Sequence, residues 1–282
     1  MIRLIGIDVD GTLLDSRGTV PDANIRAIED AVDAGIHVAL VTGRSYPFAR
    51  PVADPLPAAV TLIVSNGAVE RGRDGETYAR RLLNRDVARA VLSATRAFRD
   101  AAALIFDRDR ERQFMFETMD WEHPDRHGYW KKNRAFIAQS VPLEDALVED
   151  PIQVMFNGSV APIRALADEL RARADDYAVA LTEYAHRNFS LLDITSPEAT
   201  KGKALRWRAS QLGLDPSEVM AIGDNFNDLE MLESAGCPVV MGNAVAALQE
   251  RGWPVTGAQD DAGVADAIRR YALDVSETRR SV

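Results

Sequence analysis

Paired carboxylates follow the first apolar segment of the chain. Residues 4–7 read Leu-Ile-Gly-Ile, and Asp8 and Asp10 come directly after them, ahead of Gly11-Thr12. A short, isoleucine-rich run that stops in Asp-Gly-Thr is typical of a buried parallel strand. Alternation along a strand puts Asp8 and Asp10 on the same side, where they repel unless a cation neutralises them or one takes up a proton. An ordinary Asp-Gly turn without chemistry is the alternative, and this segment alone leaves both interpretations open.

Other polar groups occur where further predicted strands end or where a helix begins. Thr42-Gly43 and Asp224 each follow an apolar run, and Lys201 opens a helix predicted over 200–212. In a parallel sheet such strand ends meet at one edge, where α/β proteins bind their ligands. We therefore expect these groups to gather around Asp8.

Four aspartates, at positions 8, 10, 224 and 228, have the chemistry that phosphoryl transfer needs. Asp8 and Asp224 can hold Mg²⁺ through oxygen ligands, and a free oxygen of Asp8 can attack phosphorus. Asp10 can protonate the leaving oxygen and later deprotonate the water that hydrolyses the intermediate. Asp228, four residues beyond Asp224, is placed to orient Lys201 or the water ligands of the metal.

Three groups supply contacts for the phosphoryl oxygens. Thr42 offers a hydroxyl, Gly43 a backbone N–H and Lys201 a compact positive charge. Phosphoryl transfer depends mainly on positioning and charge neutralisation, and these groups provide both. Arg44 either touches the ligand or pairs with a nearby carboxylate, and the sequence leaves that choice open.

Alternating strand and helix patterns in the first and last thirds of the chain position these groups. The pattern predicts a doubly wound parallel sheet of the Rossmann-like type. The predicted strands are 4–7, 36–41, 60–64, 219–222 and 239–241, and the main predicted helices are 21–35, 200–212 and 263–271.

The character of the sequence changes between residues 84 and 196. Two amphipathic helices, 86–99 and 161–174, alternate there with about four strand-like segments, which predicts an inserted α+β domain. The core domain is therefore assigned to 1–83 and 197–282. The polar tail from Ser276 to Val282 is expected to be frayed.

The insertion contains two weaker candidates for a site. His123 and His127 are four apart and could share a helix face as metal ligands, but Pro124 makes a regular helix doubtful and no third ligand is evident. Trp121 and the pair Tyr129-Trp130 could line a substrate pocket, although packing is favoured. The basic residues Lys131, Lys132 and Arg134 are interpreted as a solvated face rather than an anion site.

Composition and charge exclude several kinds of protein for this chain. The 282 residues are 46% hydrophobic, enough for a sizeable core, and no apolar stretch reaches the roughly 18 residues of a membrane span. The first strand begins so early that no signal peptide is expected. A net charge of −10 disfavours a general nucleic-acid binder. The single cysteine, Cys237, excludes an internal disulfide and favours a cytoplasmic location.

In this order the motifs resemble those of the haloacid dehalogenase (HAD) superfamily, specifically its Cof-like phosphatases. The insertion at 84–196 resembles the cap domain of that family in length and position. The matching segments are Asp8-Val9-Asp10-Gly11-Thr12-Leu13-Leu14, Val41-Thr42-Gly43-Arg44, Ser65-Asn66-Gly67-Ala68, Lys201-Gly202-Lys203-Ala204-Leu205, Gly223-Asp224-Asn225-Phe226-Asn227-Asp228-Leu229-Glu230-Met231-Leu232, Met241-Gly242-Asn243-Ala244 and Gly263-Val264-Ala265.

The resemblance implies a role for each matching position. Asp8 would be the nucleophile and Asp10 the general acid/base. Mg²⁺ would bind the carboxylates of Asp8 and Asp224 and the backbone carbonyl of Asp10. Contacts with the substrate phosphate would come from Thr42, Gly43, Lys201 and Asn227.

Two segments depart from related patterns. The founding dehalogenases of the superfamily lack the second aspartate of the first motif, so Asp10 points to phosphate chemistry. The segment 195–200, Thr-Ser-Pro-Glu-Ala-Thr, differs from the Gly-Val-Ser often seen before the lysine. We interpret this difference as a loop variation that leaves Lys201 in place.

The leading hypothesis is a magnesium-dependent phosphomonoester hydrolase acting on a small soluble metabolite, with no nucleic-acid or membrane partner. Sugar phosphates are the first substrate class, followed by nucleotide or cofactor phosphates such as flavin mononucleotide or pyridoxal phosphate. The insertion would close over the core and select the leaving group. The alternatives are a phosphotransferase or mutase with the same intermediate, and a metabolite-binding regulator without catalysis. The oligomeric state stays open.

Overall fold

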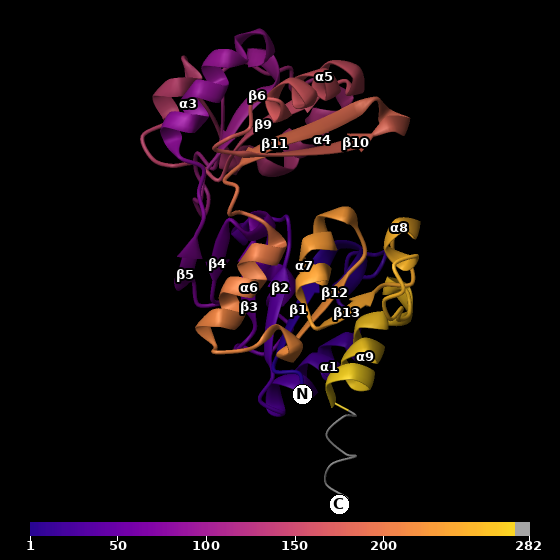
Figure 1. Cartoon of the computed structure of the whole chain (residues 1–282). Helices are drawn as coiled ribbons and strands as arrows, with labels where there is room; N and C mark the ends of the chain where they lie inside the picture. Colours follow the sequence, from indigo (N-terminus) through magenta and orange to yellow (C-terminus); the bar gives the residue numbers. More distant parts are fainter. Residues whose placement is uncertain (274–282) are drawn as a thin grey trace, which may run out of the picture. The chain divides into compact units, whose positions relative to one another are not determined.

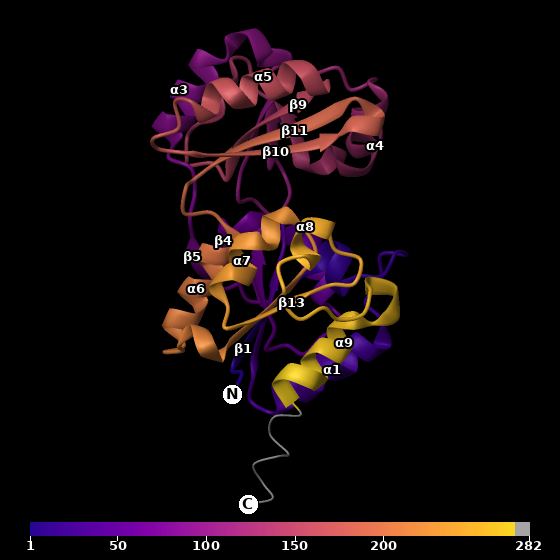
Figure 2. The ribbon, with the colours of Figure 1, turned by 45° about the vertical axis from the view of Figure 1, so that its right-hand side comes forward.

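The computed structural model describes residues 1–273 and divides into two compact units (Figures 1 and 2). The core unit comprises Met1–Arg80 and the segment from Glu198 onward, and the inserted unit comprises Arg81–Pro197. The predicted frayed tail at 276–282 lies outside the described residues. Within residues 1–273, every helix is too short or too polar to cross a membrane.

A seven-stranded sheet forms the centre of the core unit. Five neighbouring strands are parallel, and an antiparallel hairpin extends one edge. The parallel strands confirm the predicted doubly wound, Rossmann-like class. In sheet order the strands are β13 (Cys237–Val240), β12 (Val219–Gly223), β1 (Leu4–Asp8), β2 (His37–Val41), β3 (Thr61–Val64), β4 (Val69–Arg71) and β5 (Thr77–Arg80).

Helices cover both faces of this sheet, with α6 and α7 on one side and α1 and α9 on the other (Figures 1 and 2). Helix α6 packs closely on β1 at Gly6, where a Cβ would lie 2.6 Å from the Leu205 side chain. The helices of the core unit are α1 (Asp22–Asp33), α2 (Tyr46–Ala49), α6 (Lys201–Gln211), α7 (Leu229–Ser234), α8 (Ala246–Gln249) and α9 (Gly263–Ile268).

The β4–β5 hairpin is absent from the sequence-based prediction. Its strands contain three and four residues, and β4 carries Glu70 and Arg71 as buried charged residues. The connecting turn includes Gly75 at φ +92°. Short strands rich in charged residues give no apolar run, so hydrophobic patterning reads this segment as a loop.

The inserted unit is a six-stranded sheet, antiparallel except for the parallel β7–β8 pair. Helices α3 (Arg85–Ala94) and α5 (Val160–Arg171) pack on one face over a core that includes Leu104, Phe156 and Leu192. This arrangement matches the predicted α+β class. In sheet order the strands are β10 (Ala178–Tyr184), β11 (Phe189–Thr195), β9 (Gln153–Gly158), β6 (Ala102–Ile105), β7 (Phe114–Phe116) and β8 (Ile137–Gln139).

The doubt about a regular helix around Pro124 is wrong. Helix α4 runs from Pro124 to Asn133, with proline at its first position, where the missing N–H costs no hydrogen bond. His123 caps this helix, because its Nδ1 accepts the Asp125 N–H at 3.2 Å. Strand β8, also not predicted, contains only three residues.

Candidate active site

The predicted nucleophile lies at the carboxyl end of the central strand β1. Asp8 is the last residue of this strand and only 4% exposed. The register pairs Asp8 with Val41 of β2 and Ile7 with Ile222 of β12. The residues that follow β2 and β12, including Thr42 and Asp224, therefore begin beside Asp8, as expected for parallel strand ends.

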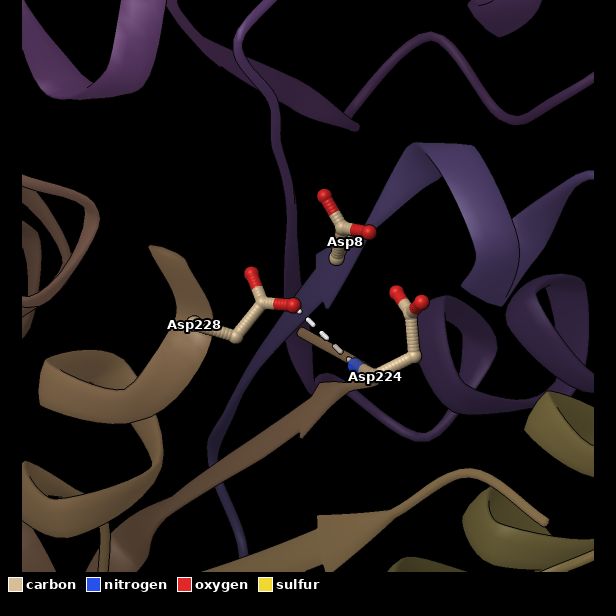
Figure 3. A group of neighbouring side chains, drawn as sticks. All are labelled: Asp8, Asp224 and Asp228. Atoms are coloured by element: carbon tan, nitrogen blue, oxygen red, sulfur yellow. Dashed lines mark hydrogen bonds between the residues drawn. The ribbon is translucent and has the colours of Figure 1, made fainter. Parts of the chain in front are cut away.

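Three carboxylates converge at this edge (Figure 3). One oxygen from each of Asp8, Asp224 and Asp228 lies within 4.8 Å of the other two. Asp8 belongs to the first strand of the chain, whereas Asp224 and Asp228 follow β12. The fold thus joins two segments that are more than 200 residues apart in sequence.

Lys201 neutralises part of this negative charge. Its Nζ donates to Asp8 Oδ1 at 2.6 Å and to Asp228 Oδ1 at 2.7 Å, and the residue is 2% exposed. Lys201 is the first residue of α6, whose N-cap Thr200 accepts the Lys203 N–H through Oγ1 at 3.0 Å. A capped helix end fixes the backbone from which the lysine extends.

A close backbone approach anchors the start of α6. Gly67, at φ +100°, lies so near the Thr200 carbonyl that a Cβ would be 2.3 Å from its oxygen. Only glycine tolerates both this conformation and this contact. Gly67 belongs to the Ser65-Asn66-Gly67-Ala68 segment, to which the sequence analysis assigned no role.

Asp228 acts on its neighbours through both oxygens. Oδ1 accepts from Lys201, and Oδ2 accepts the backbone N–H groups of Asp224 at 3.0 Å and Asn225 at 3.1 Å. Figure 3 shows the bond to the Asp224 amide. Asp228 is fully buried, and Gly223 leaves the room it needs, because a Cβ there would lie 2.6 Å from the Asp228 Cβ. With both oxygens occupied, Asp228 orients the lysine and the Asp224 turn.

Two residues of the first motif hold the side chain of Asp224. The Thr12 hydroxyl donates to Asp224 Oδ1 at 3.0 Å. Gly11, at φ +87°, lies against the other oxygen, because a Cβ there would be 2.5 Å from Asp224 Oδ2. The sequence pattern indicates only a turn at Gly11 and Thr12, and their contact with Asp224 depends on the tertiary structure.

The electrostatics of the cluster follow from burial and crowding. Burial raises the pKa of Asp8 well above its usual range, Asp228 raises it further, and Lys201 opposes both. Burial also raises the pKa of Asp224, again with a contribution from Asp228. For Lys201, burial acts to lower the pKa, but Asp8 and Asp228 together outweigh it and raise that pKa.

This donor set fits a divalent cation. Three clustered carboxylates against one lysine leave an excess of negative charge, which a cation neutralises. Carboxylate oxygens are the ligands that Mg²⁺ prefers. Both oxygens of Asp228 already accept hydrogen bonds, so Asp8 and Asp224 are the carboxylates that could bind the cation. Among residues 1–273, this is the only group of three or more potential metal ligands of this kind.

Asp10 does not lie on the strand. Strand β1 ends at Asp8, and residues 9–13 form a tight turn, so the alternation argument for a shared side fails. The Asp10 side chain is 58% exposed and forms an ion pair with Arg44, with Nε donating to Oδ2 at 2.9 Å and Nη2 to Oδ1 at 2.6 Å. Of the two alternatives left open for Arg44, the structure shows the carboxylate pair.

The predicted phosphate-binding residues occupy different environments. Thr42 is 1% exposed, and its hydroxyl accepts the Arg44 N–H at 3.1 Å. Gly43 follows it, with its Cα against the Asn66 side chain. Asn227 lies exposed in the turn that Asp228 closes.

The candidates in the inserted unit serve packing and capping. Trp121 stacks on Trp130 with ring centroids 4.9 Å apart and meets Phe116 edge to face at 5.1 Å. His127 lies 3.7 Å from Glu122 and His123 caps α4. The favoured interpretation of the aromatic residues as packing agrees with these contacts.

Comparison with known proteins now identifies the family. The profile of haloacid dehalogenase-like hydrolases matches residues 5–268, nearly the whole chain. The chain belongs to this HAD family. The match includes all the residues gathered at the end of β1 and confirms the resemblance proposed from the motifs.

Three curated proteins illustrate the range of HAD relatives. The phosphatase YwpJ of Bacillus subtilis is 29% identical over 95% of this chain and 99% of its own length. The 5-amino-6-(5-phospho-D-ribitylamino)uracil phosphatase YcsE of the same organism is 27% identical over 96% of each chain. The chloroplastic endoribonuclease YBEY of Arabidopsis thaliana is 29% identical over 94% of this chain, which spans only 46% of that longer protein.

Solved structures share the HAD fold. A haloacid dehalogenase-like hydrolase from Bacteroides thetaiotaomicron superposes with a TM-score of 0.79 and 22% identity, over 96% of this chain and 99% of that chain. The HAD subclass IIB sugar phosphatase BT4131 superposes with a TM-score of 0.74 and 18% identity, over the same fractions. At these identities the likeness establishes the fold.

Proposed function

We propose that this HAD-type phosphatase is a magnesium-dependent phosphomonoester hydrolase that transfers the phosphoryl group to Asp8 and then to water. Membership of the HAD hydrolases and relatives named as phosphatases support the general reaction on small phosphorylated metabolites. The observation that carries the specific mechanism is the convergence of Asp8, Lys201, Asp224 and Asp228 at one strand end.

The first step is attack by the Asp8 carboxylate on phosphorus. A P–O bond to Asp8 forms while the P–O bond to the leaving group breaks, and Asp10 gives its proton to the leaving oxygen. Lys201 holds the Asp8 carboxylate at 2.6 Å and keeps it oriented. Thr42 and Gly43, which follow the neighbouring strand, supply a hydroxyl and an N–H for the phosphoryl oxygens.

The second step returns the enzyme to its starting state. Asp10, now a carboxylate, takes a proton from water, whose oxygen attacks phosphorus as the bond to Asp8 breaks. Inorganic phosphate leaves and Asp10 is again protonated. Mg²⁺, held by Asp8, Asp224 and the Asp10 carbonyl, would neutralise the charge of the transferred group.

The proposed substrate class is a phosphate monoester of a polyhydroxylated carbon chain, as in sugar phosphates. A sugar phosphatase among the structural relatives and a ribityl-phosphate phosphatase among the curated ones support this choice. Nucleotide and cofactor phosphates are the second class. We assign selection among these substrates to the inserted unit. We also propose that the protein acts in the cytoplasm.

The test is phosphate release across sugar, nucleotide and cofactor phosphates, with and without Mg²⁺. We expect activity with Mg²⁺, reversible loss with a chelator, and loss in Asp8→Asn. Arg164→Gln is a matched folding control, because it removes an exposed pair with Glu183 in the inserted unit. Robust turnover by Asp8→Asn would refute the covalent route, and release of phosphate only with an added alcohol acceptor would identify a phosphotransferase.

A further inference from the structure

Two hydrogen bonds from Arg44, and not packing, orient the Asp10 side chain. The Asp10 side chain is 58% exposed, so neighbouring side chains do not restrict its rotamer. Both of its carboxylate oxygens nevertheless accept hydrogen bonds from the Arg44 guanidinium. A planar fork of two charge-assisted bonds fixes the direction of a carboxylate as well as its distance. Arg44 is itself 33% exposed and therefore better anchored than its partner.

The backbone around Arg44 is held just as firmly. The Ser65 N–H donates to the Arg44 carbonyl at 2.9 Å, the Asn66 N–H donates to the Thr42 carbonyl at 2.9 Å, and the Arg44 N–H donates to the Thr42 hydroxyl at 3.1 Å. These bonds clasp the loop 42–44 at both ends. The same loop therefore carries a proposed phosphate ligand and the partner of Asp10.

The clasp depends on an uncommon backbone conformation. Ser65 and Asn66 have φ of 51° and 54°, in the left-handed region that side chains other than glycine rarely adopt. A side chain in this region strains the backbone, and such strain concentrates at functional sites. Here the two strained residues are the ones that donate to the loop.

We propose that Arg44 is a positioning residue for the general acid/base Asp10, and that the Ser65-Asn66 turn sets Arg44 in place for this task. The inference rests on the proposed function, because it needs Asp10 as the acid. With its proton in place, Asp10 accepts from Arg44 mainly through one oxygen. When Asp10 gives that proton to the leaving oxygen, both oxygens accept, and the completed fork of Arg44 stabilises the carboxylate as it forms in the first step. Arg44 acts through Asp10 and not on the phosphate.

Leaving-group dependence tests this role. An alkyl phosphate, such as a sugar phosphate, needs a proton on its leaving oxygen, whereas p-nitrophenyl phosphate releases a stable phenolate. The kcat/KM value reports the steps up to transfer to Asp8. Since general-acid catalysis contributes about 10²–10⁴-fold, we expect Arg44→Gln to lower kcat/KM about 100-fold for the alkyl ester and less than about 10-fold for p-nitrophenyl phosphate.

Three further variants sharpen the test. Arg44→Lys keeps the charge but loses the fork, so it should fall between wild type and Arg44→Gln with the same substrate dependence. Adding Arg44→Gln to Asp10→Asn should cost little more than Asp10→Asn alone, because both remove one function. Arg164→Gln removes another two-bond Arg–Glu pair, in the inserted unit, and should leave the substrate ratio unchanged.

The outcomes separate this inference from the proposed function. An equal loss on both substrates, together with weaker inhibition by inorganic phosphate, would make Arg44 a phosphate ligand and overturn the inference. If Asp10→Asn itself shows no preference between the substrates, the acid/base assignment of Asp10 fails first. If Asp10→Asn loses more activity on the alkyl ester than on p-nitrophenyl phosphate, but both Arg44 variants keep the wild-type ratio of the two kcat/KM values, only the positioning role of Arg44 is overturned.

Discussion

Each sheet of the molecule carries an aspartate whose pKa is raised by burial, but the surroundings differ. In the core unit, Asp8 lies among Lys201, Asp224 and Asp228. In the inserted unit, Asp193 on β11 has a neutral partner, because Gln153 Nε2 donates to its Oδ1 at 2.7 Å. Burial raises the pKa of Asp193 to about 7, and no charged group among residues 1–273 offsets it.

The difference separates a carboxylate with a cationic partner from one whose hydrogen-bond partner is neutral. A buried carboxylate stays ionised and nucleophilic only where positive charge compensates its lost hydration. Lys201 provides only part of that charge for Asp8, because the pKa of Asp8 stays well above its usual range beside it, and a bound cation would add the rest. Asp193 can relieve its burial by taking up a proton instead. Variants of these residues test this contrast.

Asp8→Asn should show the largest change. An amide is not a nucleophile toward phosphorus, so kcat should fall at least about 10⁴-fold. Phosphate release with the best substrate of the screen is the measurement. The Asn side chain keeps an acceptor for Lys201, so the variant should remain folded. If it retains more than a tenth of wild-type kcat, Asp8 is not the nucleophile and the contrast between the two aspartates disappears.

Lys201→Met should show the largest loss of stability. It leaves Asp8 and Asp228 buried without their shared cation, and breaking a buried ion pair from one side typically costs about 3–5 kcal/mol. Urea unfolding at neutral pH with no divalent cation is the measurement. Lys203→Met is the matched control, because its pair with Glu198 is largely exposed and should contribute less than about 1 kcal/mol. Equal costs for the two variants would contradict the central role of Lys201.

Mg²⁺ should stabilise the wild-type protein through the same cluster. A ligand at about 100 times its Kd adds about 2.7 kcal/mol to the free energy of unfolding. The measurement is the melting temperature with and without Mg²⁺. Asp224→Asn should abolish the increase, and Thr12→Val should weaken the apparent Mg²⁺ affinity about 10-fold, because it removes the bond that orients Asp224. An unchanged Mg²⁺ effect in Asp224→Asn would place the cation elsewhere.

Asp193→Asn should change stability by an amount that depends on pH. The folded state holds the Asp193 proton up to about pH 7, whereas the unfolded chain releases it near pH 4. Between these values the folded state binds more protons, so wild-type stability from this group falls as pH rises and is lost above pH 7. The asparagine variant should melt higher than wild type at pH 8, and the gap should narrow as the pH falls toward 4. A gap that is larger at pH 5 would reverse the sign and contradict the assignment.

The parallel sheet and the buried part of the site follow directly from sequence patterns. Each core strand is an apolar run that stops in a polar motif, so the sequence alone predicts Asp8, Thr42 and Asp224 at one edge of the sheet. Lys201 could be placed there because it opens a helix. These features depend on local periodicity and on the topology of parallel strands, both of which patterning captures.

Contacts that cross between motifs could not be predicted in this way. The Thr12–Asp224 bond joins residues 212 positions apart, and the approach of Gly67 to Thr200 depends on how β3 meets α6. The predicted position of Asp10 on the strand is wrong for a related reason. Strand β1 stops at Asp8, and the turn that follows directs the Asp10 carboxylate toward Arg44. Short or charged segments such as β4 and β8 lack the apolar run on which prediction depends.

The pairing of β1 with both β2 and β12 has a consequence for the order of synthesis. The proposed nucleophile, Asp8, is synthesised before the inserted unit, but its neighbouring strand on one side, its lysine and its second acidic motif all come after residue 197. A nascent chain therefore carries Asp8 through translation of the entire inserted unit before the ammonium group that compensates it exists. Ribosome-bound or truncated chains that end before β12 have an unfinished sheet and no phosphatase centre.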